Sequence, residues 1–479
     1  MGIAANHPET HKLLQKVVKN DWNSEVRFDA IKVLTKYYKD CSENYLLLQE
    51  FIQNDNEYVD VRTDVVELLA QYYQNCPQNY LLLQQLVQDK NDDISFTAIQ
   101  CLAEYYKNRP ETYPLLQQFV QNDKDEHVRR SAILALARCY QNYPEVYSLV
   151  KQYIFNDESY WIRYVAVEAL AEHYQNHSET YQLLQQVIKN DEHECVRHMA
   201  VESLAKYYQA NPNTYSLLQQ VIQNDKDYYV RIAVVVSLAK YYKEHSNSYS
   251  LLQQIAQNDI HEIVRSVTVS NLAEYYKDYS ETYSLLQQIA INDKHEDVRS
   301  AVVKSLTEYY REYSDTYPLL QQIVQNDKHE DVRSVAVHSL AEHYKKYPNT
   351  YSLLQQIFQN DKHEDVRSII IFDLALCFHE KYLEILSIIR QIIVSDEETI
   401  KVRSSAVGGL VMIMYDDDDY DYRKLLTEDF DGFYGWIDSK TFIDEKRVNE
   451  AAKELDLSTE TIRKHYEEIA KEMPLKLKE

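Results

Sequence analysis

A repeat of 34 residues organises most of this 479-residue sequence. One aspartate recurs twelve times, and its positions are Asp21, Asp55, Asp89, Asp123, Asp157, Asp191, Asp225, Asp259, Asp293, Asp327, Asp361 and Asp396. The interval is 34 residues throughout, except for a last interval of 35. An arginine follows six or seven residues after each aspartate, apart from one unit in which Ser95 takes its place. Such a period indicates stacked units, each too small to bury its own core.

Each unit is predicted to contain two helices. The first is typified by residues 280–292, SETYSLLQQIAIN, whose Leu-Leu-x-x-Ile spacing gives one apolar stripe. The second is typified by residues 327–347, where apolar residues stand at −1, +3, +4, +7, +8 and +11 from the arginine. Asp327 and Glu330 have the spacing of a capping box at its start. The predicted fold class is therefore all-α, an α-α superhelix of about twelve two-helix units.

Glycine is almost missing: the chain has five, and none lies between Ile3 and Val407. Phosphate loops, dinucleotide fingerprints and nucleophile elbows require glycine, so we expect none of them in this stretch. Helix interiors disfavour glycine by up to about 1 kcal/mol, which accounts for its absence from a helical array. Because the internal glycines all follow Arg403, where the rhythm fails, we expect glycine to mark the end of the array.

The recurrent arginine falls in the middle of the apolar face of the second helix, where an unpaired charge would be costly. We therefore expect it to pair with the recurrent aspartate of its own unit or of a neighbour, forming a ladder along the stack. The predicted ladder residues are Asp123, Arg129, Asp157, Arg163, Asp191, Arg197, Asp225, Arg231, Asp259, Arg265, Asp293, Arg299, Asp327, Arg333, Asp361 and Arg367.

The phrase D…VRxxAVxxLA after a leucine-rich helix resembles the HEAT-repeat family of α-solenoids, over about residues 3–414. The tetratricopeptide class has the same period, but its Trp-Leu-Gly signature is missing. The resemblance to HEAT repeats implies an Asp/Arg ladder between units and second helices that line the concave side. The fuller phrase TYxLLQQ…NDxxxxVRxxAVxxLAxYY is similar to HEAT arrays associated with bacterial NACHT-type signalling NTPases. That resemblance implies a ligand-sensing or autoinhibitory arm of a defence or signalling protein, with any NTPase outside these residues.

Two positions of the second helix, +5 and +9 from the arginine, point away from its core. They hold six basic and eight acidic residues across the units, without the basic stripe of a groove that follows nucleic acid. Position +5 varies while the scaffold positions hardly change, as in a recognition surface or a merely solvated one. Our candidate partner-binding residues at this position are Leu134, Glu168, Glu202, Val236, His338 and Phe372.

Charge and composition narrow the possible partners. The formal net charge is −25 and the isoelectric point is near 5.1, so the surface repels polyphosphate and anionic lipid. The six cysteines are scattered without a CxxC pair, which favours a reducing compartment. Because neither a signal peptide nor an apolar run of membrane-spanning length occurs, we expect a cytoplasmic protein. The expected partner is a protein, with no membrane, no small-molecule substrate, and nucleic acid disfavoured.

Recurrent histidine and tyrosine residues could form metal-binding or stacking sites. Five His-Glu dipeptides invite comparison with deoxyhypusine hydroxylase, a HEAT-like di-iron enzyme, but here the pair precedes the arginine and fits helix capping better. His173 and His177 are four residues apart on one helix, a spacing that suits half of a metal site, but we favour packing. Tandem tyrosines recur at the end of the second helix, where packing also explains them. We expect no catalytic residues, cofactor or metal.

The last residues depart from the repeat. We predict an acidic linker at 415–422 and a small helical domain or cap at 423–479. Residues 440–479 resemble a helix-turn-helix in outline, although their net charge is −1 and no basic patch forms. The predicted function is a non-enzymatic protein-binding scaffold or sensor. The alternatives are a bilin lyase subunit or chaperone-like HEAT protein, and nucleic-acid binding through the tail.

Overall fold

The computed structural model describes residues 8–39, 42–393, 395 and 397–414. Within them the chain forms 24 α-helices and one short 3-10 helix, η1 (His379–Lys381), and no strand. The predicted all-α fold is confirmed. The predicted segments 415–422 and 423–479 lie outside the described residues and stay predictions. In the same described part, no helix is both long enough and apolar enough to cross a membrane.

Twelve repeats of two helices follow one another, and repeat n consists of helices α(2n−1) and α(2n). The first helices of the repeats carry odd numbers and are α1 (Pro8–Asn20), α3 (Ser42–Ile52), α5 (Pro77–Leu86), α7 (Thr112–Asn122), α9 (Pro144–Asn156), α11 (Thr180–Asn190), α13 (Pro212–Asn224), α15 (Ser248–Asn258), α17 (Ser280–Asn292), α19 (Thr316–Asn326), α21 (Thr350–Asn360) and α23 (Tyr382–Ile393). The bounds predicted for the first helix at 280–292 are those of α17.

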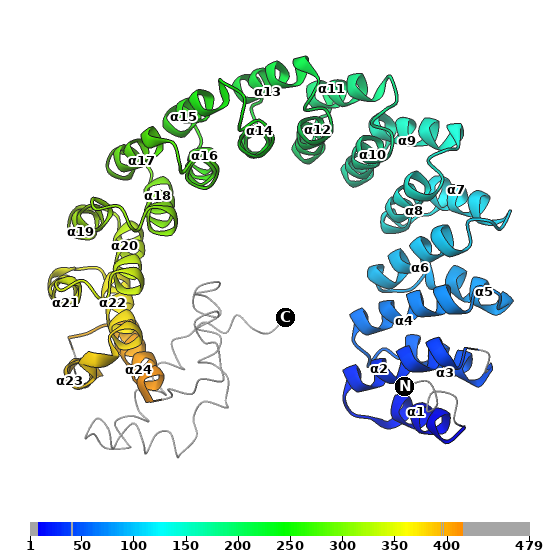
Figure 1. The fold of residues 1–479 in the computed structure, drawn as a ribbon, viewed down its shortest axis with the longest axis horizontal. Helices are drawn as coiled ribbons and strands as arrows, with labels where there is room; N and C mark the ends of the chain where they lie inside the picture. Colours follow the sequence, from blue (N-terminus) through cyan, green and yellow to red (C-terminus); the bar gives the residue numbers. More distant parts are fainter. Residues whose placement is uncertain (1–7, 40–41, 394, 396, 415–479) are drawn as a thin grey trace. The chain divides into compact units, whose positions relative to one another are not determined.

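The second helices carry even numbers, and within each compact unit they pack mainly on the second helices of adjacent repeats and on their own first helices. They are α2 (Ser24–Tyr37), α4 (Val59–Tyr72), α6 (Asp92–Tyr105), α8 (Glu126–Cys139), α10 (Tyr160–His173), α12 (Glu194–Tyr207), α14 (Tyr228–Tyr241), α16 (Glu262–Tyr275), α18 (Glu296–Tyr309), α20 (Glu330–His343), α22 (Glu364–Cys377) and α24 (Ile400–Met414). Two compact units result, Met1–Tyr242 and Lys243–Glu479. In each unit the odd-numbered and even-numbered helices form two separate rows (Figure 1).

The core lies between the two rows and repeats with the sequence. In α18, Val298, Val302, Val303 and Leu306 have no exposed surface, and Leu286 of α17 is equally buried. These residues occupy the −1, +3, +4 and +7 positions and the Leu-Leu stripe, so the predicted apolar faces are the buried ones. Burying each such side chain contributes about 1.5–3 kcal/mol.

The start of the second helix differs from the predicted capping box. Helix α20 begins at Glu330 rather than after Asp327, and its N-cap is His329, whose Nδ1 accepts the Asp331 amide hydrogen at 3.4 Å. Asp327 instead accepts the His329 amide hydrogen at 2.9 Å and faces the arginine of the preceding repeat. The capping-box assignment was wrong because the aspartate carboxylate is used between repeats rather than within one helix terminus.

The glycines near the end of the array also differ from expectation. Gly408 and Gly409 lie inside α24, so they do not mark the point where the helical repeat stops. A Cβ atom on Gly409 would come within 2.8 Å of the Cβ atom of Ala375 in α22. Glycine therefore permits close approach of the last two second helices, a requirement of packing rather than of a turn.

Candidate functional site

The ladder residues meet between successive repeats. Arg299 lies 2 % exposed, and its Nε and Nη2 donate to the Asp327 carboxylate of the next repeat at 2.7 and 2.8 Å. Its Nη1 donates to the carbonyl oxygen of Asp293, in its own repeat, at 2.9 Å. The same two-point contact joins Arg163 to Asp191, Arg197 to Asp225, Arg265 to Asp293 and Arg333 to Asp361. Fork-shaped contacts of this kind fix both distance and orientation.

The ladder changes in the first four repeats. Arg27 pairs with Glu57, and Arg62 lies 3.5 Å from Asp55 and 3.7 Å from Asp89. Arg129 donates to the carbonyl oxygens of Asp123 and Lys124 at 3.0 and 3.2 Å, but no carboxylate of the described residues lies within 4.0 Å of it. Where Ser95 replaces the arginine, its hydroxyl donates to the backbone carbonyl oxygen of Val87 at 2.7 Å. The two-point contact with the recurrent aspartate is therefore replaced in these repeats, by other ion pairs at Arg27 and Arg62 and by bonds to backbone carbonyl oxygens at Ser95 and Arg129.

The exposed face of repeats 5 to 7 departs from the repeat pattern. At −3, −2 and +1 from the arginine, repeats 9, 10 and 11 carry Glu, Asp and Ser. Repeat 5 carries Tyr160, Trp161 and Tyr164 there, and repeat 7 begins with Tyr228 and Tyr229. Trp161 is 41 % exposed and Tyr229 is 41 % exposed, although helix pairing in the scaffold is unchanged. Large aromatic residues stand where repeats 9 to 11 are polar, and a cluster of exposed rings favours a surface for contact.

These side chains form one continuous surface across three second helices. Trp161 contacts Tyr160 and Tyr164 within helix α10, with ring centroids 5.1 and 5.7 Å apart. Between α12 and α14, the His198 ring stacks on Tyr229 at 4.3 Å. We call this the aromatic–acidic surface and define it as Tyr160, Trp161, Tyr164, Glu168, His198, Glu202 and Tyr229.

The acidic part of this surface, Glu168 and Glu202, comes from position +5, and Glu172 at position +9 lies near it. Burial raises the pKa of Glu168, and the like charges of Glu172 and Glu202 raise it further, against smaller opposing effects of Lys206 and Arg130. Burial, together with the charges of Glu168 and Glu202, raises the pKa of Tyr164 to about 12. In the described structure neither Glu168 nor Glu172 has a lysine or arginine within 4.0 Å. Several carboxylates thus share one patch, and the nearby Lys206 and Arg130 offset their repulsion without forming an ion pair with Glu168 or Glu172.

The candidate residues chosen from position +5 have different fates. Glu168, Glu202 and Val236 lie on or beside the aromatic–acidic surface, and Val236 is 37 % exposed. Leu134 is half-buried on α8. Phe372 is only 7 % exposed and therefore offers little surface to a partner.

His338, in the second unit, is partly exposed and contacts the buried carboxylate of Asp373. Its Nδ1 lies 3.2 Å from Asp373, and its Nε2 lies 3.4 Å from Glu342. The hydrogen bond that His338 makes to the Asp373 carboxylate raises the pKa of His338, although burial opposes this. Burial also raises the pKa of Asp373. This residue therefore joins α20 to α22.

One group of possible metal ligands occurs among the described residues. Ligand atoms of His193, Glu194 and Cys195 lie within 4.8 Å of one another. The His193 Nδ1 already accepts the Cys195 amide hydrogen at 3.2 Å as the N-cap of α12, and Tyr160 stacks on the ring at 3.7 Å. This geometry serves the helix terminus and the aromatic contact.

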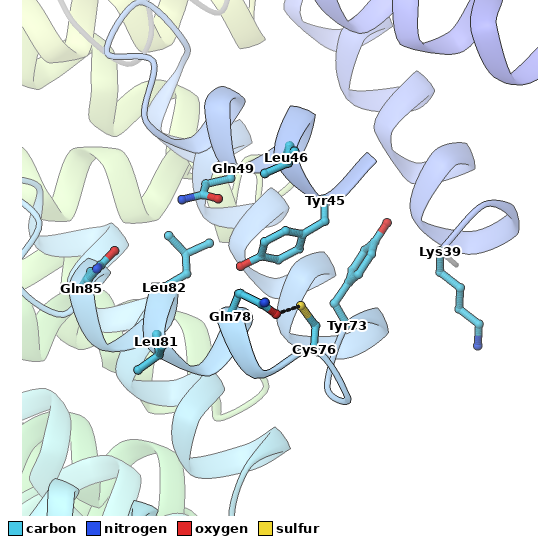
Figure 2. A pocket seen from close by; sticks show the side chains of 10 residues that line it. All are labelled: Lys39, Tyr45, Leu46, Gln49, Tyr73, Cys76, Gln78, Leu81, Leu82 and Gln85. Carbon is cyan, nitrogen blue, oxygen red and sulfur yellow. Dashed lines mark hydrogen bonds between the residues drawn. The ribbon is translucent and has the colours of Figure 1, made fainter. Parts of the chain in front are cut away.

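A pocket lies on the first helices of repeats 2 and 3 (Figure 2). The pocket measures about 540 Å³, and its lining includes Leu46, Leu81 and the ring of Tyr45. Both leucines are more than half exposed, at 58 % and 57 %, and each directly follows the tyrosine of its helix. Later repeats carry Pro, Ser or Gln after that tyrosine. Among its lining residues only Lys39 is charged, so this pocket differs in chemistry from the aromatic–acidic surface.

Sequence reasoning found the carboxylates of the aromatic–acidic surface but missed its aromatic residues. Position +5 gave Glu168 and Glu202, whereas Trp161, Tyr164 and Tyr229 occupy −2, +1 and −2. A signal was present, because three positions that are polar in repeats 9 to 11 are aromatic in repeat 5. Comparing each repeat with the others at every exposed position would have revealed it.

A family model of HEAT repeats matches residues 79–171, 147–239, 181–273 and 249–341. These matches together span residues 79–341, which is more than half of the chain. No curated protein sequence matches it.

Solved structures with a similar fold include two of Kap95p and one of Kap121p. Yeast importin-beta (Kap95p) aligns with a TM-score of 0.47 and 13 % identity over 96 % of this chain and 67 % of that one. Kap95p studied with RanGDP aligns with a TM-score of 0.47 and 14 % identity, over 96 % of this chain and 66 % of that one. Kap121p aligns with a TM-score of 0.44 and 14 % identity, over 97 % of this chain and 55 % of that one. The chain spans about two thirds of the length of Kap95p and about half of that of Kap121p.

Proposed function

Because the chain belongs to the HEAT-repeat family, we propose that it is a non-enzymatic solenoid that binds a protein partner through the second helices of repeats 5 to 7. One observation carries this proposal. The aromatic–acidic surface carries large aromatic residues at positions that are polar in repeats 9 to 11, while Ile162, Val167 and Leu170 of the same helix keep the buried apolar pattern. A surface that spans three repeats contacts a partner at many points with little ordering on binding, which suits macromolecular recognition.

Aromatic residues favour an interface over simple solvation. Tryptophan and tyrosine supply most of the binding energy in many protein interfaces, and they are costly to leave exposed without a use. Trp161 and Tyr229 are both 41 % exposed, and each touches a neighbouring ring that holds its position. This surface is therefore already formed before a partner arrives.

Site-specific photo-crosslinking in the native cell tests the proposal. A benzoylphenylalanine placed at Trp161 is expected to capture one discrete protein, and the capture is expected to disappear when Tyr229→Ala is added. The matched control carries the crosslinker at Phe155, an exposed aromatic residue of the same repeat on the first helix. Equal capture at both positions, or capture at neither, contradicts this proposal.

The second part of the proposal concerns biological context. We propose that the solenoid acts as a ligand-sensing or autoinhibitory arm of a NACHT-type defence or signalling protein. The support is the resemblance of the phrase around residues 280–310 to arrays of that kind. Mass spectrometry of the full protein purified from its native source is expected to find NACHT sequence, either in the same polypeptide or in a bound one. Its absence contradicts the sensor role and leaves the protein-binding proposal intact.

A further inference from the structure

We propose that the aromatic–acidic surface recognises arginine or lysine side chains presented by a segment of its protein partner. This inference rests on the proposed function and specifies the chemistry of the same surface. It draws on the unpaired carboxylates, the exposed rings beside them and their spacing across three helices.

The carboxylates of this surface favour a cation. Glu168 and Glu172 have no lysine or arginine within 4.0 Å in the described structure, and Glu202 has only His198, at 3.9 Å. Repulsion between these carboxylates contributes to the raised pKa of Glu168, so an arriving cation relieves an existing electrostatic cost. Lys206 and Arg130 lower this pKa by a smaller amount, and Lys206 lies over the Tyr207 ring, 4.7 Å from its centroid.

The aromatic rings supply the second half of the recognition. Guanidinium and ammonium groups are attracted to the faces of tryptophan and tyrosine rings, most strongly where water is partly excluded. Trp161 lies against Tyr164, and Tyr164 is close enough to Glu168, Glu202 and Tyr229 to feel their charges or rings. A cation bound at Tyr164 would therefore meet a ring face and two carboxylates together.

The equivalent surface of repeats 9 to 11 is occupied by its own pairs. Glu296 faces the His329 Nε2 at 3.8 Å, and Glu330 faces the His363 Nε2 at 3.6 Å. These histidines belong to the following repeat and supply local partners for the carboxylates. Repeats 5 and 7 carry aromatic residues at the corresponding helix starts, so these carboxylate–histidine pairs are replaced there by rings, which attract an external cation.

A fluorescent hexa-arginine peptide provides the direct test, with a hexa-citrulline peptide of the same shape and no charge as its control. We expect the full chain to bind the arginine peptide and not the citrulline peptide, measured by fluorescence anisotropy at about 0.15 M salt. Trp161→Ala is expected to weaken binding by about fivefold to tenfold. The double change Glu168→Gln and Glu202→Gln is expected to weaken it by about tenfold or more.

Matched variants separate this surface from general attraction to an acidic protein. Phe155→Ala removes an exposed aromatic residue from the first helix of repeat 5, and Glu111→Gln removes an exposed carboxylate from the start of α7. We expect both controls to change affinity by less than about twofold. Circular dichroism and hydrogen exchange establish that every variant keeps its helices. Equal losses in control and surface variants would overturn the inference, because the net charge of −25 would then explain the binding.

The two proposals can fail separately. If capture of the crosslinked partner depends on Tyr229 but is not prevented by hexa-arginine, the cationic chemistry is wrong and the protein-binding function stands. If hexa-arginine binds through Trp161 and Glu168 but no cellular protein crosslinks there, the function is wrong. Displacement of the native partner by hexa-arginine and not by hexa-citrulline supports both.

Discussion

Repeats 5 to 7 and repeats 9 to 11 have the same internal scaffold and different surfaces. In both regions an arginine of one second helix donates hydrogen bonds to the aspartate of the next repeat, as Arg163 does to Asp191 and Arg299 does to Asp327. At −3, −2 and +1, however, repeat 5 carries Tyr160, Trp161 and Tyr164 where repeats 9 to 11 carry Glu, Asp and Ser, and repeat 7 carries tyrosine at −3 and −2. Positions that hold repeats together are therefore physically separate from positions that face outward.

This separation explains how a repetitive sequence can carry a specific site. Buried positions are fixed by packing, because a change of even one methylene group is felt in a dense core. Exposed positions change at a cost usually within about 0.5 kcal/mol, so a local surface can be built without altering the stack. The predictions below test how complete this separation is.

The largest expected effect comes from breaking the regular ladder. Arg299→Ala leaves the Asp327 carboxylate buried without its partner, and we expect local stability to fall by roughly 3–5 kcal/mol. Native-state hydrogen exchange of repeats 9 and 10 measures this, because a long array need not unfold in one step. The control Arg311→Ala removes an exposed arginine beside Glu312 and is expected to cost under about 0.5 kcal/mol. Equal protection in the two variants would show that the ladder is dispensable.

Acid is expected to weaken the same contact in a defined direction. Burial alone would raise the pKa of Asp327, but hydrogen bonds from Arg299 and the His329 amide outweigh it and hold this pKa below its ordinary value. A depressed folded pKa contributes stability above the unfolded pKa of about 3.9, and the contribution is lost as pH falls through the folded pKa. Because Arg299→Ala removes the group that holds this pKa low, we expect the stability difference between the unaltered chain and Arg299→Ala to shrink as pH falls below about 3.9, measured by native-state hydrogen exchange at a series of pH values. A difference that stays constant as pH falls would contradict this assignment.

A smaller effect is expected where the ladder is incomplete. Arg129 bonds only to backbone carbonyl oxygens, so Arg129→Ala should cost about 1–2 kcal/mol, less than Arg299→Ala. Hydrogen exchange in repeats 4 and 5 provides the measurement. A cost equal to that of Arg299→Ala would mean that the carbonyl contacts, and not the carboxylate, make the ladder strong.

The smallest change in stability is expected from exchanging surfaces. The triple change Tyr160→Glu, Trp161→Asp and Tyr164→Ser gives repeat 5 the surface pattern of repeat 9. We expect hydrogen-exchange protection in repeats 5 and 6 to shift by no more than about 1 kcal/mol, because these residues are only partly buried. Loss of the photo-crosslink together with retained protection would show that surface and scaffold are independent. Unfolding of the repeat would show that the rings are part of the core.

The sequence predicted the repeat, its two helices and the apolar faces, because each of these follows from local periodicity. It placed the first helix correctly at 280–292. It misplaced the start of the second helix at Asp327. A carboxylate near a helix terminus fits the capping pattern, and the local sequence does not show that Arg299 of the preceding repeat binds this carboxylate instead. The glycines at 408 and 409 were misjudged for a similar reason, because close helix contact and chain termination both favour glycine.

What the sequence by itself determined is the solenoid: a strict 34-residue period with one apolar stripe per helix has no other way to bury its stripes than by stacking. What only the tertiary structure decided is which residues of different repeats meet. The pairing of Arg299 with Asp327, the stacking of His198 on Tyr229 and the proximity of Tyr164 to Glu202 join residues 28, 31 and 38 positions apart. Local pattern carries no information on such distances, because they depend on how one helix pair is rotated against the next.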